Sequence, residues 1–188
     1  MRLFIAVTLP EPLKLAIHRA TEPLRNAAPT IRWVSADQLH ITLKFLGEVK
    51  EPAVPAIGAA LEGTADSHAP FDLDFAGIGA FPNTRRPRVY WLGVHPNSAL
   101  HGLQETVETG IGPLGFPREA RPFHPHLTLG RVGTEVPAGE LRAAERLAGQ
   151  LDYNGKLVVN SAELMQSRLS PKGARYEVLL SARLKGGN

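Results

Sequence analysis

Two short segments of this 188-residue sequence repeat one arrangement of side chains that can transfer protons. Residues 38 to 47 read QLHITLKFLG and residues 124 to 131 read HPHLTLGR, so each segment places a histidine two positions before a threonine in an apolar run. Histidine takes up or releases a proton near neutral pH, and a threonine hydroxyl can donate a hydrogen bond to a developing oxyanion. The two segments together could supply an acid, a base and two hydrogen-bond donors.

Both segments have the composition and alternation of β-strands, and residues two apart in a strand share a face. We therefore predict that His40 and Thr42 lie on one face of their strand, and that His126 and Thr128 repeat this arrangement. If the two strands border a shared groove, one histidine can deprotonate a nucleophile while the other protonates a leaving oxygen. An in-line displacement at phosphorus requires that division of roles.

Two other interpretations of these histidines are open. A single His-x-Thr in a strand is usually a structural histidine, although two copies, each followed by leucine, are harder to explain in that way. His124 lies two positions before His126, so His40, His124 and His126 could instead bind zinc. The sequence has no HExxH segment, no carboxylate cluster and no cysteine to support a metal site. We expect no metal.

Strand-like and helix-like segments alternate along the chain, which predicts an α+β fold. No Gly/Ser linker or charged block divides the sequence, so we expect a single domain over residues 1–188. The predicted strands are 2–9, 31–34, 40–46, 71–80, 88–94, 126–132, 155–168 and 174–184, the last two joined by a turn at 170–173 (SPKG). The predicted helices are one that follows Pro10 and reaches Leu24, and others at 52–63, 97–111 and 139–150.

A weak internal repeat relates the two halves of the chain. The two motif histidines are 86 positions apart, and the same offset joins Thr42 with Thr128, Pro10 with Pro96, and Ile17 with Leu103. Each half then reads strand, helix, histidine-bearing strand, helix. We expect two similar lobes related by a pseudo-two-fold axis, which would bring the two histidines together.

Composition and charge limit the class of protein. Hydrophobic residues make up 43% of the chain, which is enough for a globular core. No apolar run reaches the roughly 18 residues that cross a bilayer, and the absence of cysteine fits a cytoplasmic protein. The net charge is only +3, but arginines concentrate in NTRRPR (83–88) and PREARP (117–122). Such clusters favour a phosphate-bearing partner, although solvated loop charge would look the same.

These motifs and their flanks resemble the two-histidine (2H) phosphoesterase superfamily, specifically the RNA 2′,3′-cyclic phosphodiesterases that are also called 2′-5′ RNA ligases. The resemblance covers nearly the whole chain. It is carried by MRLFIAVTLP at the start, RWVSADQLHITLKFLGEV and PFHPHLTLGRV around the two motifs, and AELMQSRLSPKGARYEVL at 162–179. It implies a bilobal α+β fold in which two antiparallel sheets line a central cleft and helices lie outside.

The resemblance also implies a reaction, the metal-independent hydrolysis of a 2′,3′-cyclic phosphate at an RNA 3′ end to a 2′-phosphate, without a cofactor. It implies that His40 donates a proton to the departing 3′ oxygen and that His126 accepts a proton from water, with Thr42 and Thr128 on the non-bridging oxygens. The repeat makes the two histidines nearly equivalent, so the residues alone do not assign acid and base. Reversible 2′-5′ ligation would use the same groups.

Several other residues are candidates for binding substrate. Lys44 lies an even number of positions after His40, so in a regular strand it would share the face of His40 and could add charge at the phosphate. Phe45 could stack on a base, with core packing as the alternative. Arg131 would face away by strict alternation, but Gly130 could permit a twist that brings it to the phosphate. The candidates for contacting the RNA backbone are Arg85, Arg86 and Arg88.

Two alternative functions remain open at this stage. The same chemistry could act on a small cyclic nucleotide or an ADP-ribose cyclic phosphate, or the motifs could grip an RNA end without turnover. We expect a monomer that binds RNA ends and no membrane.

Overall fold

The computed structural model of the protein describes residues 1–171 and 173–186, in which helices and strands alternate. The strands are β1 (Arg2–Thr8), β2 (Arg32–Trp33), β3 (His40–Glu48), β4 (Phe71–Phe81), β5 (Val89–Val94), β6 (His126–Arg131), β7 (Lys156–Val159), β8 (Ser161–Ser170) and β9 (Gly173–Arg183). The helices are α1 (Glu11–Ala20), α2 (Glu22–Ala27), α3 (Val54–Asp66), α4 (Ser98–Ile111) and α5 (Ala138–Ala148), with short 3₁₀ turns η1 (Ala36–Gln38), η2 (Glu51–Ala53) and η3 (Gly112–Leu114). The predicted α+β class is confirmed.

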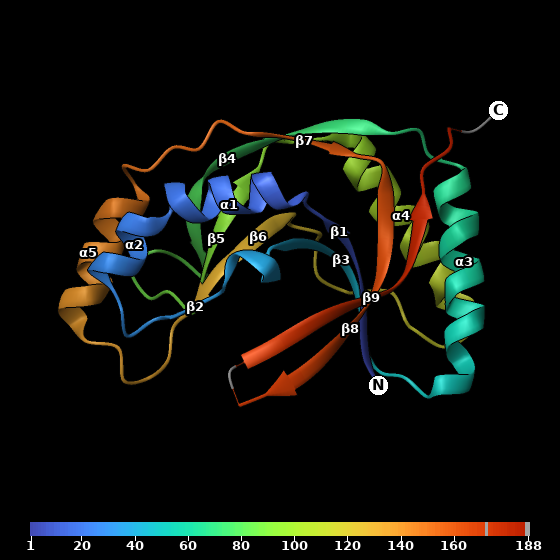
Figure 1. The fold of residues 1–188 in the computed structure, drawn as a ribbon, viewed down its shortest axis with the longest axis horizontal. Helices are drawn as coiled ribbons and strands as arrows, with labels where there is room; N and C mark the ends of the chain where they lie inside the picture. Colours follow the sequence, from blue (N-terminus) through green and yellow to red (C-terminus); the bar gives the residue numbers. More distant parts are fainter. Residues whose placement is uncertain (172, 187–188) are drawn as a thin grey trace.

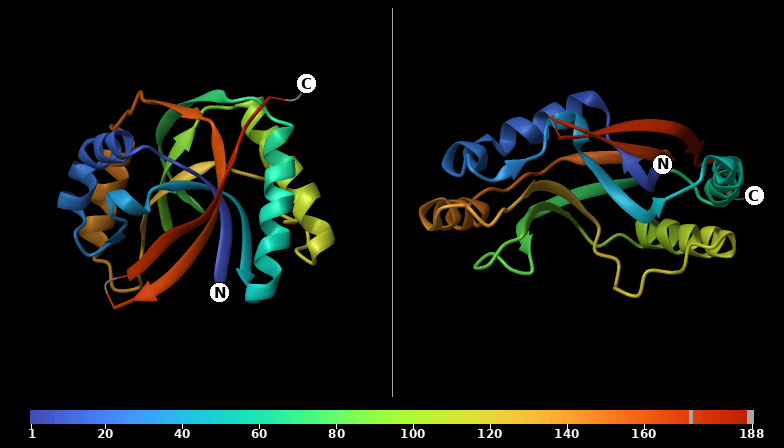
Figure 2. Two further views of the ribbon diagram at one scale, coloured as in Figure 1. Left: turned by 45° about the vertical axis from the view of Figure 1, so that its right-hand side comes forward. Right: turned by 90° about the horizontal axis from the view of Figure 1, so that it is seen from below.

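The strands form one connected path of antiparallel pairs in the order β7-β4-β5-β6-β3-β1-β8-β9, with β2 beside β6. The sheet is strongly curled, with α1, α2 and α5 at one end of the molecule and α3 and α4 at the other (Figure 1; Figure 2). Within the described residues, β3 and β6 are paired only through Ile41 and Leu127, which we call the seam pair. The two expected antiparallel sheets are therefore joined along a narrow seam.

The strand order is symmetrical about the seam pair. β3 and β6 lie on either side of it, and β1 and β5, which the offset of the repeat relates, are their outer neighbours. β4 comes from the first half of the chain but lies beside β5, whereas β8 comes from the second half and lies beside β1. The two halves of the sequence are interleaved in the sheet, and the division of the domain into two lobes stays a prediction.

One face of the central strands packs against the helices. Ile5, Ile41 and Leu127 are fully buried in the same cluster as Ile17 of α1 and Leu103 of α4. The opposite face of β1 forms a separate small cluster of Phe4, Ala6 and Met165 with Tyr176. We call this second face, which also carries the motif histidines and threonines, the open face of the sheet.

The structure corrects two predicted elements. The helix after Pro10 breaks at Thr21, because Pro23 lacks an N–H and cannot lie inside a continuous helix, so α2 begins anew with this proline in its first turn. The predicted strand 155–168 is two strands separated at Asn160, since β7 pairs with β4 while β8 pairs with β1 and β9.

The predicted SPKG turn lies between β8 and β9, where Ser170 is the partner of Gly173. Its Lys172 lies outside the described residues. A search of the described part of the chain finds no helix with the length and hydropathy needed to span a membrane.

Candidate active site

β3 and β6 bring the four motif residues together on the open face. The residues on either side of Ile41 and Leu127 in their strands point to the opposite face of the sheet from the seam pair. Because the two strands are antiparallel, His40 lies across from Thr128 and Thr42 lies across from His126. Side chains directly opposite in an antiparallel pair have Cβ atoms about 5 Å apart. We call this group of two histidines and two threonines the HxT array. The predicted sharing of a face is therefore confirmed, whereas the chemical roles of the four residues remain predictions.

Both histidines have the same tautomer. Nδ1 of His40 lies 2.7 Å from the carbonyl oxygen of Gln38, and Nδ1 of His126 lies 2.6 Å from the carbonyl oxygen of His124. A carbonyl oxygen can only accept a hydrogen bond, so each Nδ1 carries a proton and donates it. The Nε2 atom of each ring is left to exchange protons. His124 thus serves the array through its backbone, which differs from the zinc arrangement considered from the sequence.

Aromatic rings hold each imidazole from its outer side. The His40 ring lies 4.9 Å from the ring of Phe4 and 5.0 Å from that of Tyr176, measured between centroids. The His126 ring lies 5.1 Å from that of Phe81, in an edge-on arrangement. Together with the Nδ1 hydrogen bonds, these contacts fix the orientation of both rings.

Burial lowers the pKa of both histidines. For His40, desolvation is the largest cause, the carbonyl that accepts from Nδ1 raises the pKa, and the positive charges of Lys14, His126 and Arg131 lower it. For His126, desolvation again dominates, and the charge of Arg131 also lowers the pKa. Because a proton on His126 lowers the pKa of His40, the array favours holding one proton over holding two.

The threonine hydroxyls complete the array as hydrogen-bond donors. Both side chains are half-buried. In residues 1–171 and 173–186, no intramolecular hydrogen bond involves the hydroxyl of Thr42 or of Thr128. Each hydroxyl is therefore available to an oxygen atom bound between the two histidines.

An extra residue in β3 overturns the prediction for Lys44. Thr42 and Lys44 face consecutive residues of β1, so Leu43 is a bulge that shifts the alternation by one position. Lys44 is consequently buried on the helix side, where its Nζ lies 2.5 Å from Oε2 of Glu108 and donates to the carbonyl of Pro117 at 2.9 Å. The prediction that Lys44 adds positive charge at the phosphate is therefore wrong.

The same bulge brings Phe45 to the open face. The residue is 68% exposed, and its ring lies 6.2 Å from the ring of Phe4, which in turn contacts His40. The alternative that Phe45 packs in the core is therefore wrong, and the stacking of its ring on a base stays a prediction.

β6 contains an equivalent bulge after its own threonine. Thr128 and Gly130 face consecutive residues of β5, which leaves Leu129 as the extra residue. Arg131 is therefore exposed on the side of the array, and its charge acts on both motif histidines. Gly130 lies under the ring of Trp33, where an added Cβ would meet the ring at 2.5 Å. Arg131 does not face away from the array, as strict alternation would require, because the bulge shifts the alternation by one position.

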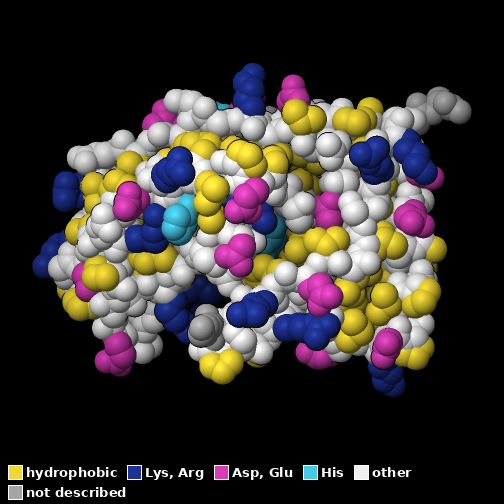
Figure 3. Space-filling view, viewed as in Figure 1, with side chains coloured by type: hydrophobic (Ala, Val, Ile, Leu, Met, Phe, Trp, Pro, Cys, Tyr) yellow, Lys and Arg dark blue, Asp and Glu magenta, His cyan; other side chains and the backbone are white. Residues whose placement is uncertain are grey.

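The arginine loop, residues 82–88, connects β4 to β5. The side-chain oxygen of Asn83 accepts the backbone N–H groups of Arg85 and Arg86, each at 3.0 Å, and so orders the turn. Arg85, Arg86 and Arg88 are all exposed, and in the described chain none of them belongs to an ion pair. These three predicted residues are thus free positive charges. Figure 3 shows Lys and Arg side chains in and around a hollow of the molecular surface.

Sequence reasoning missed the residues that support His40. Gln38 accepts the backbone N–H of Ser35 at 2.9 Å and donates from Nε2 to the carbonyl of Ala174 in β9 at 2.5 Å. Lys14 of α1 donates to the carbonyl of Asp37 at 3.0 Å. The Gln38 carbonyl of η1 orients His40, and η1 is therefore bonded both to α1, through Lys14, and to β9, through Gln38. The spacing of Ser35 and Gln38 is a capping-box signal, but nothing local indicates the contact with β9.

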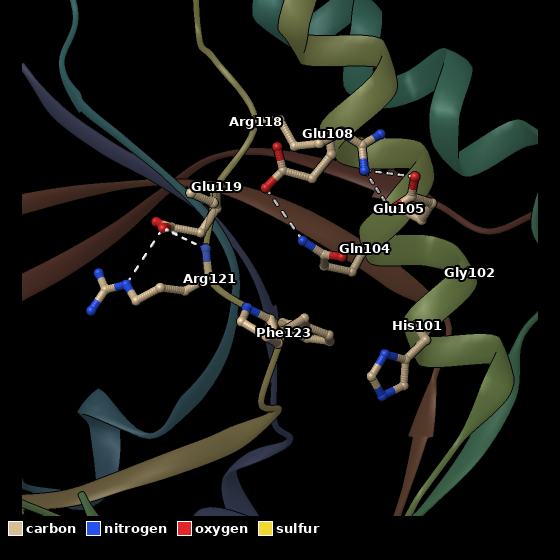
Figure 4. A pocket seen from close by; sticks show the side chains of 11 residues that line it. His101, Gly102, Gln104, Glu105, Glu108, Arg118, Glu119, Arg121 and Phe123 are labelled. Carbon is tan, nitrogen blue, oxygen red and sulfur yellow. Dashed lines mark hydrogen bonds and ion pairs between the residues drawn. The ribbon is translucent and has the colours of Figure 1, made fainter. Parts of the chain in front are cut away.

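A cavity of about 580 Å³ lies between α4 and residues 118–123, and no residue of the HxT array lines it (Figure 4). Its charges neutralise each other: Arg118 pairs with Glu105 at 2.7 Å and Arg121 with Glu119 at 3.5 Å. The arginines of the PREARP segment are therefore solvated ion-pair partners. Phe123 also lines this cavity.

Comparison with known proteins shows related sequences and structures. Residues 9–170 match the model of the 2′-5′ RNA ligase superfamily. A relative from Methanothermobacter thermautotrophicus named RNA 2′,3′-cyclic phosphodiesterase is 35% identical over 178 residues, 94% of this chain and 95% of the relative. The crystal structure of TT0787 of Thermus thermophilus has a TM-score of 0.82 at 32% identity, covering 100% of both chains. That of E. coli LigT complexed with 3′-AMP has a TM-score of 0.73 at 29% identity, covering 97% of both.

Proposed function

Because this chain belongs to the 2′-5′ RNA ligase superfamily, we propose that it hydrolyses the 2′,3′-cyclic phosphate at RNA 3′ ends to a 2′-phosphate. Relatives named RNA 2′,3′-cyclic phosphodiesterase align over 94% to 100% of the chain at 32% to 36% identity. The observation that carries the proposal is the HxT array, in which two imidazoles of the same tautomer and two available hydroxyls share the open face.

The proton balance of the reaction closes within the array. His126 takes a proton from water at Nε2 as the water oxygen bonds to phosphorus, and the bond from phosphorus to the 3′ oxygen breaks. His40 gives the proton on its Nε2 to that departing oxygen. Thr42 and Thr128 donate hydrogen bonds to the non-bridging oxygens, where negative charge builds up. The products are a 2′-phosphate and a free 3′-hydroxyl.

Residues around the array would bind the rest of the substrate. Arg131 would stabilise the phosphate, a role supported by the effect of its positive charge on both histidines. The exposed ring of Phe45 offers a surface for a base. The free arginines of the arginine loop fit an RNA backbone.

The test is turnover of a short RNA that ends in a 2′,3′-cyclic phosphate, with EDTA present. We expect the native protein to form the 2′-phosphate, and His40→Ala and His126→Ala each to lose about 10²- to 10⁴-fold in rate. His95→Ala, at an exposed histidine after β5, is the matched control. Turnover that survives either motif substitution would overturn the assignment of these residues.

A parallel assay on small cyclic phosphates decides the substrate class. The likeness to E. coli LigT, which was crystallised with 3′-AMP, is the reason to include a mononucleotide. Turnover of a mononucleotide 2′,3′-cyclic phosphate without turnover of the RNA would favour a small-molecule substrate. Binding of the RNA end without any hydrolysis would favour a binding module.

We also propose that the protein acts as a monomer in the cytoplasm. All four residues of the HxT array come from one chain, and the sequence contains no cysteine that an oxidising compartment would pair. Light scattering of the purified protein tests the oligomeric state.

A further inference from the structure

We propose that Arg32 binds the phosphodiester immediately upstream of the cyclic phosphate, the one that joins the last two nucleotides of the RNA. This inference rests on the proposed function and on the assignment of His40 as the acid. Arg32 lies outside both HxT motifs, and its contact would make the protein prefer an RNA end to a nucleoside cyclic phosphate that has a free 5′-hydroxyl.

The local structure of β2 turns Arg32 toward the open face of the sheet. The ring of the next residue, Trp33, lies over Gly130 and packs against the main core cluster. The same ring lies 5.8 Å from the ring of the buried Tyr90, and its Nε1 donates to the carbonyl of Ala28 at 2.8 Å. Trp33 is therefore fixed on the helix side, and because successive strand residues point to opposite faces, Arg32 lies on the open face.

Strand β6 places Arg131 directly opposite Arg32. The two residues are cross-strand partners where β2 lies beside β6 (Figure 1), and the backbone N–H of Val34 donates to the carbonyl of Leu129 at 2.9 Å in the same pairing. Partners of this kind share a face of the sheet and have Cβ atoms about 5 Å apart. We call Arg32 and Arg131 the cross-strand arginine pair.

The cross-strand arginine pair carries two positive charges that nothing neutralises within the described chain. Both side chains are exposed, and in residues 1–171 and 173–186 neither belongs to an ion pair. Like charges directly opposite each other destabilise a sheet. A bound anion would remove this repulsion, and guanidinium groups bind phosphate oxygens through paired hydrogen bonds. The pair therefore fits a phosphate group.

The cross-strand arginine pair forms the row of side chains that follows the HxT array. Along β6, His126 is followed by Thr128 and then by Arg131. β5 occupies one edge of β6, so β3 and β2 share the other, where His40 lies across from Thr128 and Arg32 lies across from Arg131. Arg32 is therefore beyond His40 on the side away from His126. Two strand residues span about 7 Å, which is comparable with the spacing of successive phosphates in single-stranded RNA.

The geometry of displacement at phosphorus directs the RNA along this row order. Water enters from the side of His126, and the leaving 3′ oxygen lies on the opposite side of phosphorus, next to His40. That oxygen belongs to the terminal ribose, whose 5′ oxygen carries the upstream phosphodiester. The chain therefore continues from His40 toward Arg32. Arg131 is the nearer member of the pair to the cyclic phosphate, since it lies on the same strand as His126 and its charge acts on both histidines.

The test compares three substrates that differ only upstream of the cyclic phosphate. They are adenosine 2′,3′-cyclic phosphate with a free 5′-hydroxyl, an adenosine dinucleotide ending in the same cyclic phosphate, and that dinucleotide with a neutral methylphosphonate as its linkage. We expect Arg32→Gln to lower kcat/KM for the phosphodiester dinucleotide about tenfold, because one charge-assisted contact is lost. The other two substrates should keep their native values, and turnover of the nucleoside substrate shows that the variant is folded.

A matched control makes the same change of charge elsewhere. Arg19 is an exposed arginine of α1 that forms no ion pair in the described chain, and Arg19→Gln should leave kcat/KM unchanged for all three substrates. An equal loss in this control would reduce the effect to net charge and overturn the proposal.

Three results in Arg32→Gln would also overturn the upstream contact. An equal loss on all three substrates would place Arg32 at the cyclic phosphate itself. An equal loss on the two dinucleotides alone would mean that the contact does not depend on the charge of the linkage. An unchanged kcat/KM for the phosphodiester dinucleotide would mean that Arg32 makes no contact with it.

The native protein separates this inference from the proposed function. Equal kcat/KM for the phosphodiester dinucleotide and its methylphosphonate analogue would overturn the upstream site and leave the phosphodiesterase intact. Turnover of the nucleoside substrate alone, or of none of the three, would overturn both.

Discussion

A histidine whose Nδ1 donates to a backbone carbonyl has one nitrogen left for chemistry. In both motifs that carbonyl belongs to the residue two positions earlier, so the segment that leads into each strand sets the tautomer of the imidazole at the start of the strand. The array therefore needs no carboxylate to orient its histidines, unlike many catalytic histidines. Acid and base differ only in which Nε2 holds the proton when substrate binds.

The dependence of kcat/KM on pH should be bell-shaped. The rate rises as the proposed base His126 loses its proton and falls as the proposed acid His40 loses its own. Since burial lowers both pKa values below 6.5, we expect the maximum on the acidic side of pH 6.5. Steady-state rates of the native protein across pH test this, and a single-sided sigmoid would contradict an acid–base pair.

Arg131 provides the variant that checks the cause of this pH dependence. Its positive charge lowers the pKa of both histidines, so Arg131→Gln should move both limbs of the profile to higher pH while reducing the rate. Arg142→Gln, at an exposed arginine of α5, is the control. Limbs that stay in place would show that the charge of Arg131 does not act on the histidines.

At the scale of single residues, alternation predicted the shared faces of the motifs but failed just beyond each threonine. Lys44 was expected at the phosphate and is buried, whereas Arg131 was expected to face away and lies beside the array. One bulge in each strand causes both errors, and a bulge depends on the register of the neighbouring strand. No local signal in the sequence shows that register.

Among the elements, the short turn η1 orients His40 and is itself bonded to β9. Gln38 joins it to β9 through one amide hydrogen bond, while its backbone carbonyl orients His40. Gln38→Glu keeps the shape but replaces the donor with an acceptor that faces the carbonyl of Ala174. We expect the rate to fall about tenfold, with the basic limb of the pH profile, that of His40, displaced.

A matched control defines the outcome for Gln38. Gln150→Glu, at an exposed position after α5, makes the same change of charge elsewhere and should leave the profile in place. A rate loss in Gln38→Glu with both limbs of the profile unmoved would indicate a general structural effect, contrary to the expected effect on His40.

The buried pair of Lys44 and Glu108 joins β3 to α4 and to the segment that leads to β6. Lys44→Met leaves a buried carboxylate without a partner, so we expect the free energy of unfolding to fall by about 3–5 kcal/mol. Lys44→Met/Glu108→Met removes both charges and should recover most of that loss, as measured by denaturant unfolding. Equal losses in the single and double variants would contradict a coupled ion pair.

At the scale of elements, periodicity predicted the helices and strands that are continuous. The apolar face predicted for α4, formed by Leu100, Leu103, Val107 and Ile111, is fully buried. The breaks were harder to predict. Pro23 gave a local signal for the break at Thr21, but the break at Asn160 has a topological cause, since the chain there passes between opposite ends of the sheet order.

For the whole molecule, the lowered pKa values of the histidines imply sensitivity to acid. The unfolded chain binds protons near pH 6.5, whereas the folded chain binds them only at lower pH, so stability present above pH 6.5 is lost as the pH falls through the folded pKa values. We expect His40→Asn/His126→Asn to lose less stability than the native protein between neutral pH and pH 5 in denaturant titrations. His95→Asn, at an exposed histidine, is the control. Parallel losses in all three proteins would contradict this linkage.

The antiparallel pairing of β3 and β6 has a consequence for which product is formed. A half turn about the seam pair exchanges the two histidines and exchanges the two threonines, so the array by itself does not distinguish the 2′ oxygen of a ribose from the 3′ oxygen. The same half turn exchanges Phe45 with Arg131, and these two side chains are unlike. The choice between the 2′ and the 3′ oxygen must therefore come from the residues that flank the array, where Phe45 lies on one flank and Arg131 lies on the other.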